Sequence, residues 1–197
     1  MINYLAALRP CLAAALVLVA APTLAAWELD GERSIVQFLS VKNAGIAELH
    51  HFKALSGTVA DDGLAQVVID LDSVETLVPI RNQRMRELFF ETVRFPAATL
   101  SAMVPASLLD MPVGESVTSE LRFSIDLHGV AAPKTARVLV TRLADGALQV
   151  VISDPIILDT GNFGLDAGVE MLREIAGLKS ISTAVPVSGQ LVFTPAS

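Results

Sequence analysis

The chain has 197 residues, a length that fits one domain or a small pair of domains. Hydrophobic residues make up 52% and charged residues 18%, against roughly 25% charged in an average globular domain, so much apolar surface must be buried or removed. The formal net charge of -7 argues against a nucleic-acid partner, because affinity for a phosphate backbone comes from Lys and Arg.

Residues 1–26 have the pattern of a cleaved signal peptide. Arg9 supplies a positive start, an apolar run follows from Leu12 to Ala21, and small residues allow cleavage after Ala25 or Ala26, of which we favour Ala26. A retained membrane anchor is the alternative, but the apolar run is about half the roughly 20 residues that a spanning helix needs. We therefore predict export to the periplasm and a mature domain over residues 27–197.

Cys11 is the only cysteine, and it lies inside this leader without a lipobox-like sequence before it. The sequence therefore predicts neither lipidation nor a disulfide. Removing the leader takes away Arg9 and no acidic residue, so the formal charge becomes -8 and the acidic character belongs to the folded domain.

The rest of the chain alternates mostly with period two, in short apolar runs separated by Gly, Asp, Asn and Pro, which is typical of many strands joined by turns. About eight strands are predicted. They lie near residues 33–42, 53–60, 64–73, 97–105, 117–128, 134–144, 147–157 and 183–194.

The clearest alternation runs from Leu121 to Leu127, with apolar and polar side chains at successive positions. It predicts a strand with one buried face. The Asp-Asp-Gly sequence at 61–63 and the Asp-Gly pair at 145–146 each separate two strand-like runs. Since Asp and Gly tolerate the positive φ angles of tight turns, both predict antiparallel hairpins.

Two stretches break the alternation and predict short helices. Pro79 suits a first helical position, and apolar residues recur at a spacing of four as far as Phe89. A second helix is predicted from about Ala167 to Ala176, with Asp166 able to cap its start and Gly177 able to end it.

This pattern predicts a mainly β protein, an antiparallel sandwich or a closed barrel of eight strands with two short helices. Closure removes the exposed edge strands that invite aggregation. A barrel of eight strands is either filled by side chains or holds one small ligand.

Signatures of catalysis are absent. The chain has no Gly-x-Ser-x-Gly, no phosphate-binding loop, no His-Glu-x-x-His and no cysteine after the leader. His50 and His51 are neighbours that point to opposite faces of an extended strand, and His128 has no partner at metal-ligand spacing. We therefore predict no metal, no cofactor and no enzyme.

Basic residues gather in one stretch, at Arg81, Arg84, Arg86 and Arg94. One reading is a receptor for an anionic head group near a helix N-terminus. The other, which we favour, is an exposed helix face paired with Glu75, Glu87 and Glu91, and such surface pairs contribute about 0 to 1 kcal/mol.

Six phenylalanines are scattered over the predicted strands and their ends. They are Phe38, Phe52, Phe95, Phe123, Phe163 and Phe193. Most are expected in the core, and some can line a cavity.

A series of short motifs resembles the YceI-like family in order and spacing, over essentially the whole mature chain. The motifs are Trp27 to Asp30, Ser34 to Phe38, Phe52 with Ser56-Gly57, Ile69 to Thr76, Arg81 to Arg86, Phe95-Pro96, Leu127 to Val130 and Asn162 to Gly164. Two stretches depart from the pattern, because Asn162 replaces a usual Asp and residues 42–52 replace a simpler Gly-x-Phe segment.

This resemblance implies a lipocalin-like antiparallel barrel in an exported bacterial protein. It implies that a tunnel in the barrel holds the polyisoprenoid chain of a polyprenyl phosphate or of a quinone-type lipid. A transient contact with a membrane is a further expectation, and the oligomeric state is left open.

On this basis we predict a binding protein whose tunnel holds the tail and whose mouth meets the head group. The candidate ligand-binding residues are Arg81, Asn82 and Met85 at the mouth and Phe38, Phe52, Phe95, Phe123 and Phe163 along the wall. One alternative is a filled barrel that binds no ligand and acts in protein interaction or stress protection. Another is an isoprenoid-modifying enzyme, for which Asp70, Asp126 and His128 are the residues to inspect.

Overall fold

The computed structural model describes residues 25–196 as one sheet of twelve strands with a few short helices. The strands are β1 Ala25–Leu29, β2 Ile35–Lys42, β3 Ile46–Phe52, β4 Leu55–Ala60, β5 Leu64–Asp70, β6 Val74–Glu75, β7 Ala97–Met103, β8 Ser116–Leu127, β9 Val130–Arg142, β10 Leu148–Ile152, β11 Ile156–Asp159 and β12 Ala184–Pro195. The helical segments are η1 Leu71–Ser73, α1 Pro79–Arg84, the π-helix η2 Met85–Phe90, α2 Ala106–Leu109, η3 Thr160–Phe163 and α3 Asp166–Ile175. The leader predicted over residues 1–26 lies almost wholly outside the described residues, and β1 begins at its last two.

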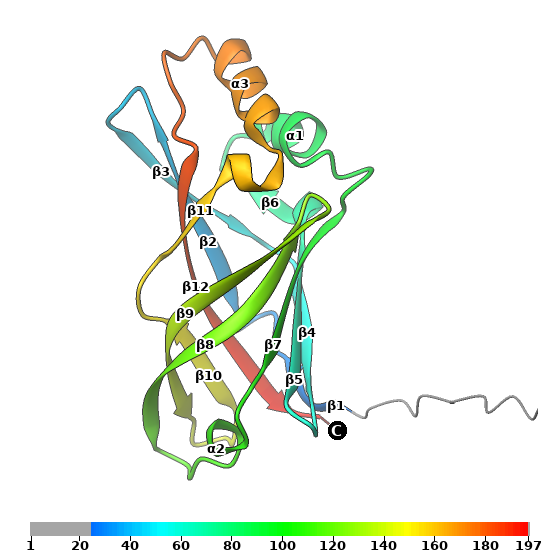
Figure 1. Cartoon of the computed structure of the whole chain (residues 1–197), viewed down its shortest axis with the longest axis vertical. Helices are drawn as coiled ribbons and strands as arrows, with labels where there is room; N and C mark the ends of the chain where they lie inside the picture. The colour runs from blue at the N-terminus through cyan, green and yellow to red at the C-terminus, as the bar shows by residue number, and fades with distance from the viewer. Residues whose placement is uncertain (1–24, 197) are drawn as a thin grey trace, which may run out of the picture.

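The sheet closes on itself as an antiparallel barrel of eight strands (Figure 1). The order around the barrel is β1, β4, β5, β7, β8, β9, β10 and β12, and β1 pairs with both β4 and β12. Toward the end of the barrel that carries α1 and α3, β12 also pairs with β2, β2 with β3 and β3 with β6, so these strands extend the wall. Closure decides between the two architectures that the sequence left open, and the mainly β barrel with short helices is confirmed.

The eight predicted strands correspond to β2, β4, β5, β7, β8, β9, β10 and β12. The sequence analysis missed β1, β3, β6 and β11. β3 lacks a clean alternation because His50 and Glu48 occupy inward positions that are usually apolar. β1 begins at the last two residues of the predicted leader, and only Trp27 to Leu29 remain after it, which is too short a run for alternation to indicate a strand.

The hairpins and the half-buried strand are confirmed. β4 and β5 pair across the turn at 61–63, and β9 and β10 pair across 145–146, where Gly63 and Gly146 have φ angles of 88° and 82°. In β8, Ile125 and Leu127 are buried while their polar neighbours are exposed. The period-two pattern therefore located the inner face of the barrel correctly.

Both predicted helices are present at one end of the barrel (Figure 1). The first begins at Pro79 as α1 and continues as η2. Asp166 was expected to cap α3, but Leu165 is the N-cap residue and the Asp166 carboxylate accepts a hydrogen bond from Thr160 Oγ1 at 2.7 Å. A Cβ atom on Gly168 would lie 2.8 Å from the Leu88 carbonyl oxygen, so glycine allows α3 to pack closely on η2.

The interior divides into two hydrophobic clusters, one toward each end of the barrel. The cluster toward α2 includes Trp27, Leu108, Val140 and Phe193, and it fills that end with side chains. The cluster beneath α3 and η2 includes Phe38, Phe52, Phe90, Leu127 and Phe163. This second cluster surrounds a large cavity.

The β8–β9 turn supplies a test of this packing. Gly129 has a φ of 77°, and an added Cβ would lie 2.9 Å from Cε1 of Phe95. Gly146 has a φ of 82° with nothing within 4 Å of such a Cβ. Gly146→Ala should therefore cost about 1 kcal/mol for the backbone alone, and Gly129→Ala at least about 1 kcal/mol more.

Urea unfolding of the two variants measures this difference. Equal losses of stability in both would show that Phe95 does not restrict the turn.

Candidate functional site

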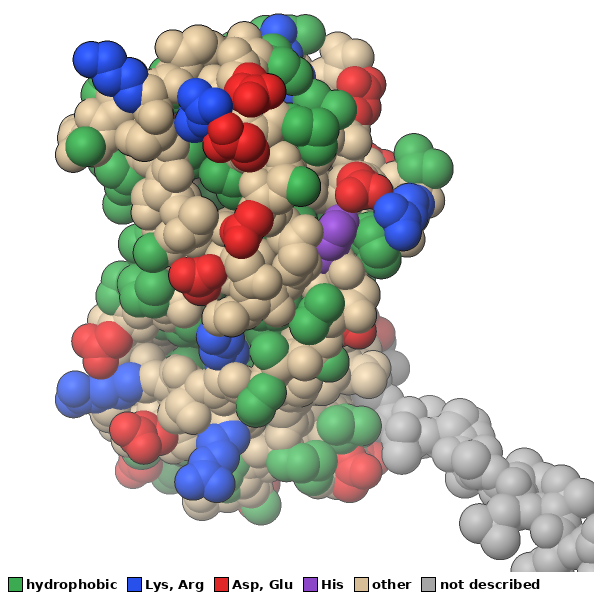
Figure 2. All heavy atoms as spheres, turned by 45° about the horizontal axis from the view of Figure 1, so that its top comes forward, with side chains coloured by type: hydrophobic (Ala, Val, Ile, Leu, Met, Phe, Trp, Pro, Cys, Tyr) green, Lys and Arg blue, Asp and Glu red, His purple; other side chains and the backbone are tan. Residues whose placement is uncertain are grey.

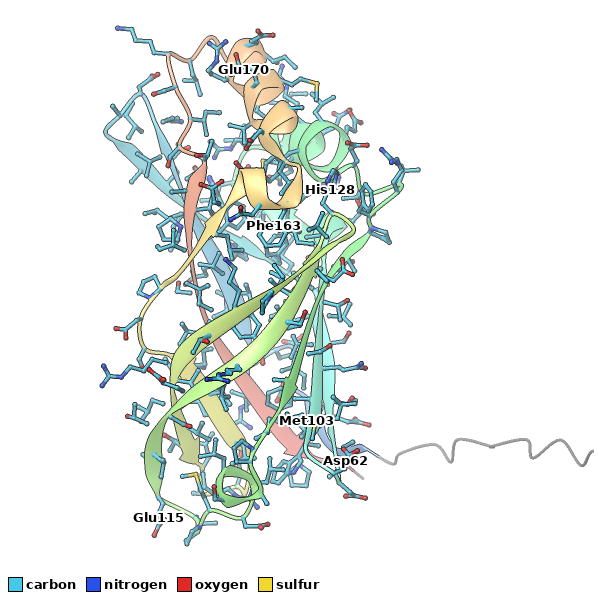
Figure 3. The ribbon with its side chains drawn as sticks, in the orientation of Figure 1. Asp62, Met103, Glu115, His128, Phe163 and Glu170 are labelled. Atoms are coloured by element: carbon cyan, nitrogen blue, oxygen red, sulfur yellow. The ribbon has the colours of Figure 1, made fainter. Side chains whose placement is uncertain are left out.

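The barrel contains an apolar cavity of about 430 Å³ beneath α1, η2 and α3. This volume lies within the roughly 300 to 1,000 Å³ of ligand pockets. Its walls come from β2, β3, β5, β7, β8, β11 and β12, and its cover from the helical segments, including Phe163 of η3 (Figure 3). In the same view, the Asp62 turn lies at the opposite end of the molecule from Glu170 of α3.

The cavity changes from apolar to charged along two adjacent strands. Alternate side chains of the two strands line it, and the register pairs Val36 with Phe52, Phe38 with His50 and Ser40 with Glu48. Lys42 is the next lining residue of β2, near the tip of the hairpin (Figure 1). The lining therefore suits an amphiphile, with its tail at the apolar end and its polar end toward the hairpin tip.

The charged end of the cavity is organised by Glu48. Its Oε2 atom accepts from Lys42 Nζ at 2.9 Å and from Arg81 Nη1 at 2.6 Å, and Arg81 Nη2 donates to the Thr76 carbonyl oxygen at 2.6 Å. The hydrogen bond from Lys42 lowers the pKa of Glu48, with further lowering by the Arg81 charge. The side chains of Lys42, Glu48 and Arg81 are 24%, 32% and 27% exposed, so this end of the cavity reaches solvent.

His50 lies one step deeper and is only 4% exposed. Its Nε2 atom lies 2.9 Å from Ser40 Oγ, and its ring packs 5.2 Å from that of Phe38. Burial, and after it the positive charge of Arg81, lower the pKa of His50 to about 4. His50 is therefore neutral at pH 7, and among residues 25–196 its Nδ1 atom has no hydrogen-bond partner.

The low pKa of His50 predicts that acid destabilises the protein. In the unfolded chain His50 titrates near 6.5, and in the folded protein near 4. Between these values the unfolded state binds more protons, so stability is lost as the pH falls from 6.5 toward 4, by up to about 3 kcal/mol. His50→Gln should remove this part of the pH dependence.

Urea unfolding as a function of pH compares the wild type with His50→Gln, and His51→Gln serves as the matched control on the other face of β3. Parallel curves for the wild type and His50→Gln over this range would contradict the assignment.

The structure brings six of the eight predicted ligand-binding residues to the cavity. They are Phe38, Phe52, Arg81, Met85, Phe123 and Phe163. Their contact with a ligand stays a prediction, but they now share one surface.

Asn82 and Phe95 lie elsewhere. Asn82 is buried beside β6, where its Oδ1 accepts from the Thr76 amide at 2.8 Å and its Nδ2 donates to Glu75 at 2.9 Å, so it holds the start of α1 in place. The Phe95 ring packs 4.2 Å from the ring of His128, outside the cavity. Asn82 was predicted to lie at the mouth, but its amide satisfies the backbone of the preceding loop instead.

The arginines of the basic stretch divide between the two interpretations, a receptor for an anionic head group and an exposed face paired with acidic residues. Arg81 and Arg84 line the cavity, whereas Arg94 pairs with Glu91 at 2.7 Å. Of the other expected partners, Glu75 pairs with Lys53 and Glu87 accepts from Gln83. Figure 2, with the helical end tilted forward, shows acidic and basic side chains intermixed.

The sequence analysis missed Ser40, Lys42, Glu48 and His50 as lining residues, and it named Arg84 only within the basic stretch. Alternation carried a signal for those on β2 and β3, because they continue the inward positions of Phe38 and Phe52. The opposite faces of the two neighbouring histidines are confirmed, since His50 is buried and His51 is half-buried. The sequence could not show that these polar side chains line a cavity, because that depends on the pairing of β2 with β3.

The residues named for an isoprenoid-modifying enzyme do not converge. Asp70 and Asp126 are exposed. His128 Nδ1 donates to the Phe163 carbonyl oxygen at 3.2 Å, and His128 does not line the cavity. Within residues 25–196, no three His, Cys, Asp or Glu side chains form a metal-binding group. No helix in the same range is long and apolar enough to cross a membrane.

Comparison with solved structures finds the same fold in bacterial proteins. A polyisoprenoid binding domain from Saccharophagus degradans, implicated in plant cell wall breakdown, is 36% identical with a TM-score of 0.85, and the match covers 88% of this chain and 100% of that one. BcnA from Burkholderia cenocepacia is 20% identical with a TM-score of 0.65, over 84% and 99% of the two chains. A Campylobacter jejuni YceI protein, in a mutant form carrying monobromobimane, is 13% identical with a TM-score of 0.51, over 75% and 84%.

These last two similarities concern the fold alone. No curated protein matches the sequence. Residues 27–193 match the model of the YceI-like domain family. With this match and 36% identity to a polyisoprenoid binding domain, the chain belongs to the YceI-like domain family.

Proposed function

We propose that this protein binds a polyisoprenoid or quinone-type lipid, with the tail in the apolar part of the cavity and the head group at its charged end, and that it is not a catalyst. The observation that carries the proposal is the change in lining from Phe38 and Phe52 to Lys42 and Glu48 along β2 and β3. This gradient matches the apolar tail and the polar head group of an amphiphile.

The energetics of such binding favour the apolar part. Each methylene transferred from water into an apolar cavity contributes about 0.8 kcal/mol, so a long tail needs few polar contacts for stable binding. The similarity to a polyisoprenoid binding domain supports an isoprenoid tail. The cavity also argues against the ligand-free alternative, because side chains fill only the end of the barrel toward α2.

Mass spectrometry of the protein purified under native conditions tests the proposal directly. We expect a stoichiometric added mass that denaturation releases as an isoprenoid lipid. The proposal fails if delipidated, folded protein takes up neither polyprenyl phosphates nor quinones.

Export to the periplasm is the second part of the proposal. Its support is the leader pattern, in which a short apolar run follows Arg9 and ends at small residues. N-terminal sequencing of the periplasmic fraction should find Ala26 or Trp27 as the first residue. Recovery of the full-length chain in the membrane fraction would favour a retained anchor.

A further inference from the structure

We propose that the charged end of the cavity is a site for an anionic head group of the phosphate-ester class, bound by Lys42, Arg81 and His50. The inference rests on the proposed function, because it assigns the head group of the lipid whose tail the cavity holds. It separates a phosphate ester from the neutral quinone and alcohol head groups that the same tail can carry.

The first argument is charge. The basic side chains that line the cavity are Lys42, Arg81 and Arg84, and the acidic ones are Glu48 and Asp159. Three basic groups against two acidic ones give this surface a net positive charge, in a chain whose formal net charge is -7. Arg84 makes no salt bridge in the part of the chain that the structure describes. An anion therefore meets more attraction here than the protein as a whole offers.

The second argument is unused hydrogen-bonding capacity. Arg81 Nε and His50 Nδ1 are both buried, and neither has a partner among residues 25–196. A guanidinium has five N–H donors and an ammonium three, so Arg81 and Lys42 keep donors free after binding Glu48 and Thr76. Buried donors without partners are costly, and a ligand that carries several acceptor oxygens would satisfy them.

The third argument is the position of His50. If the Ser40 hydroxyl donates to Nε2, the neutral ring carries its proton on Nδ1 and offers it to a ligand. Lys42 Nζ and Arg81 Nη1 both contact the Oε2 atom of Glu48, so the two positively charged groups are held close together. This geometry suits a compact anion with several oxygens better than a single carbonyl or hydroxyl group.

The experiment compares geranylgeranyl phosphate with geranylgeraniol, which share one tail and differ only in the head group. Calorimetry on delipidated wild type should show the phosphate binding at least about tenfold more tightly than the alcohol. Arg81→Met should remove most of this preference, measured as the ratio of the two affinities in the same variant. Arg137→Met, on an exposed arginine of the outer face of β9, is the matched control and should leave the preference intact.

Arg81 also supports local structure, so a second measurement uses the unaltered protein. NMR titration of the His50 ring should show its pKa rising from about 4 when the phosphate ligand is bound, because a nearby anion stabilises the imidazolium. The charged groups that face His50 are Lys42 on β2, Glu48 on β3 and Arg81 on α1, and His51 lies next to it in the chain on the other face of β3. The alcohol should leave the His50 titration unchanged.

The outcomes separate this inference from the proposed function. Equal affinity for phosphate and alcohol, or an unmoved His50 titration with the phosphate ligand, overturns the head-group site while lipid binding stands. Binding of neither ligand by folded protein overturns the proposed function. If inorganic phosphate alone shifts His50 as strongly and competes for the site, the site takes a free anion and the lipid head-group assignment is wrong.

Discussion

Val185→Trp is expected to reduce lipid uptake at least about tenfold while the protein stays folded. Val185 is a half-buried residue of β12 that lines the cavity, and it pairs with Leu158 on the neighbouring strand β11. An indole ring at this position occupies space that the tail needs. If two methylenes of the tail lose their apolar contacts, about 1.6 kcal/mol of binding free energy is lost, which corresponds to more than tenfold in affinity.

The measurement is the dissociation constant for an isoprenoid probe, with circular dichroism and thermal unfolding to establish folding. Leu139→Trp is the matched control, because Leu139 is exposed on the outer face of β9 and is not a lining residue. Unchanged uptake by folded Val185→Trp would place the tail outside this cavity.

Phe163→Ala is expected to destabilise the protein by about 3 to 5 kcal/mol, the range for removing a fully buried aromatic side chain. Phe163 is 0% exposed in η3, and it packs in the cluster beneath α3 while its carbonyl oxygen accepts from His128 (Figure 3). A single domain has a total stability of about 5 to 15 kcal/mol, so this loss can unfold much of the population.

Urea unfolding measures the loss. Phe163→Leu, which keeps most of the apolar volume, should cost clearly less, and Phe95→Ala should also cost less because Phe95 is only half-buried. A loss below about 1 kcal/mol for Phe163→Ala would mean that the surroundings collapse into the space, and that Phe163 does not hold η3 and the β8–β9 turn together.

The two predictions depend on a division of the barrel that the sequence does not reveal. Phe193 and Phe163 are equivalent in the sequence, as single aromatics near strand ends. In the fold, Phe193 belongs to the cluster that fills the end toward α2, and Phe163 lines the cavity beneath α3. The type of side chain indicates that a residue is buried. The arrangement of the strands decides whether it packs against other side chains or lines the cavity.

Local patterns determined much of this protein. Alternation along residues 121–127 fixed the inner face of β8, the Asp-Gly turns fixed two hairpins, and the spacing after Pro79 fixed the first helix. These features follow from steric and hydrogen-bonding preferences within a few residues. The same patterns predicted seven of the eight barrel strands, together with β2, without deciding between a barrel and a sandwich.

The tertiary structure decided closure, the cavity and its polar end. β1 pairs with β12 over a separation of more than a hundred residues, which no local pattern reports. Arg81 meets Glu48 because α1 folds back over β3, and Asn82 turns inward because the Thr76 amide needs an acceptor there. The role of a charged or amide side chain depends on the groups that the fold places beside it. The sequence could therefore predict the types of residue in a site, but not which individual residues lie in it.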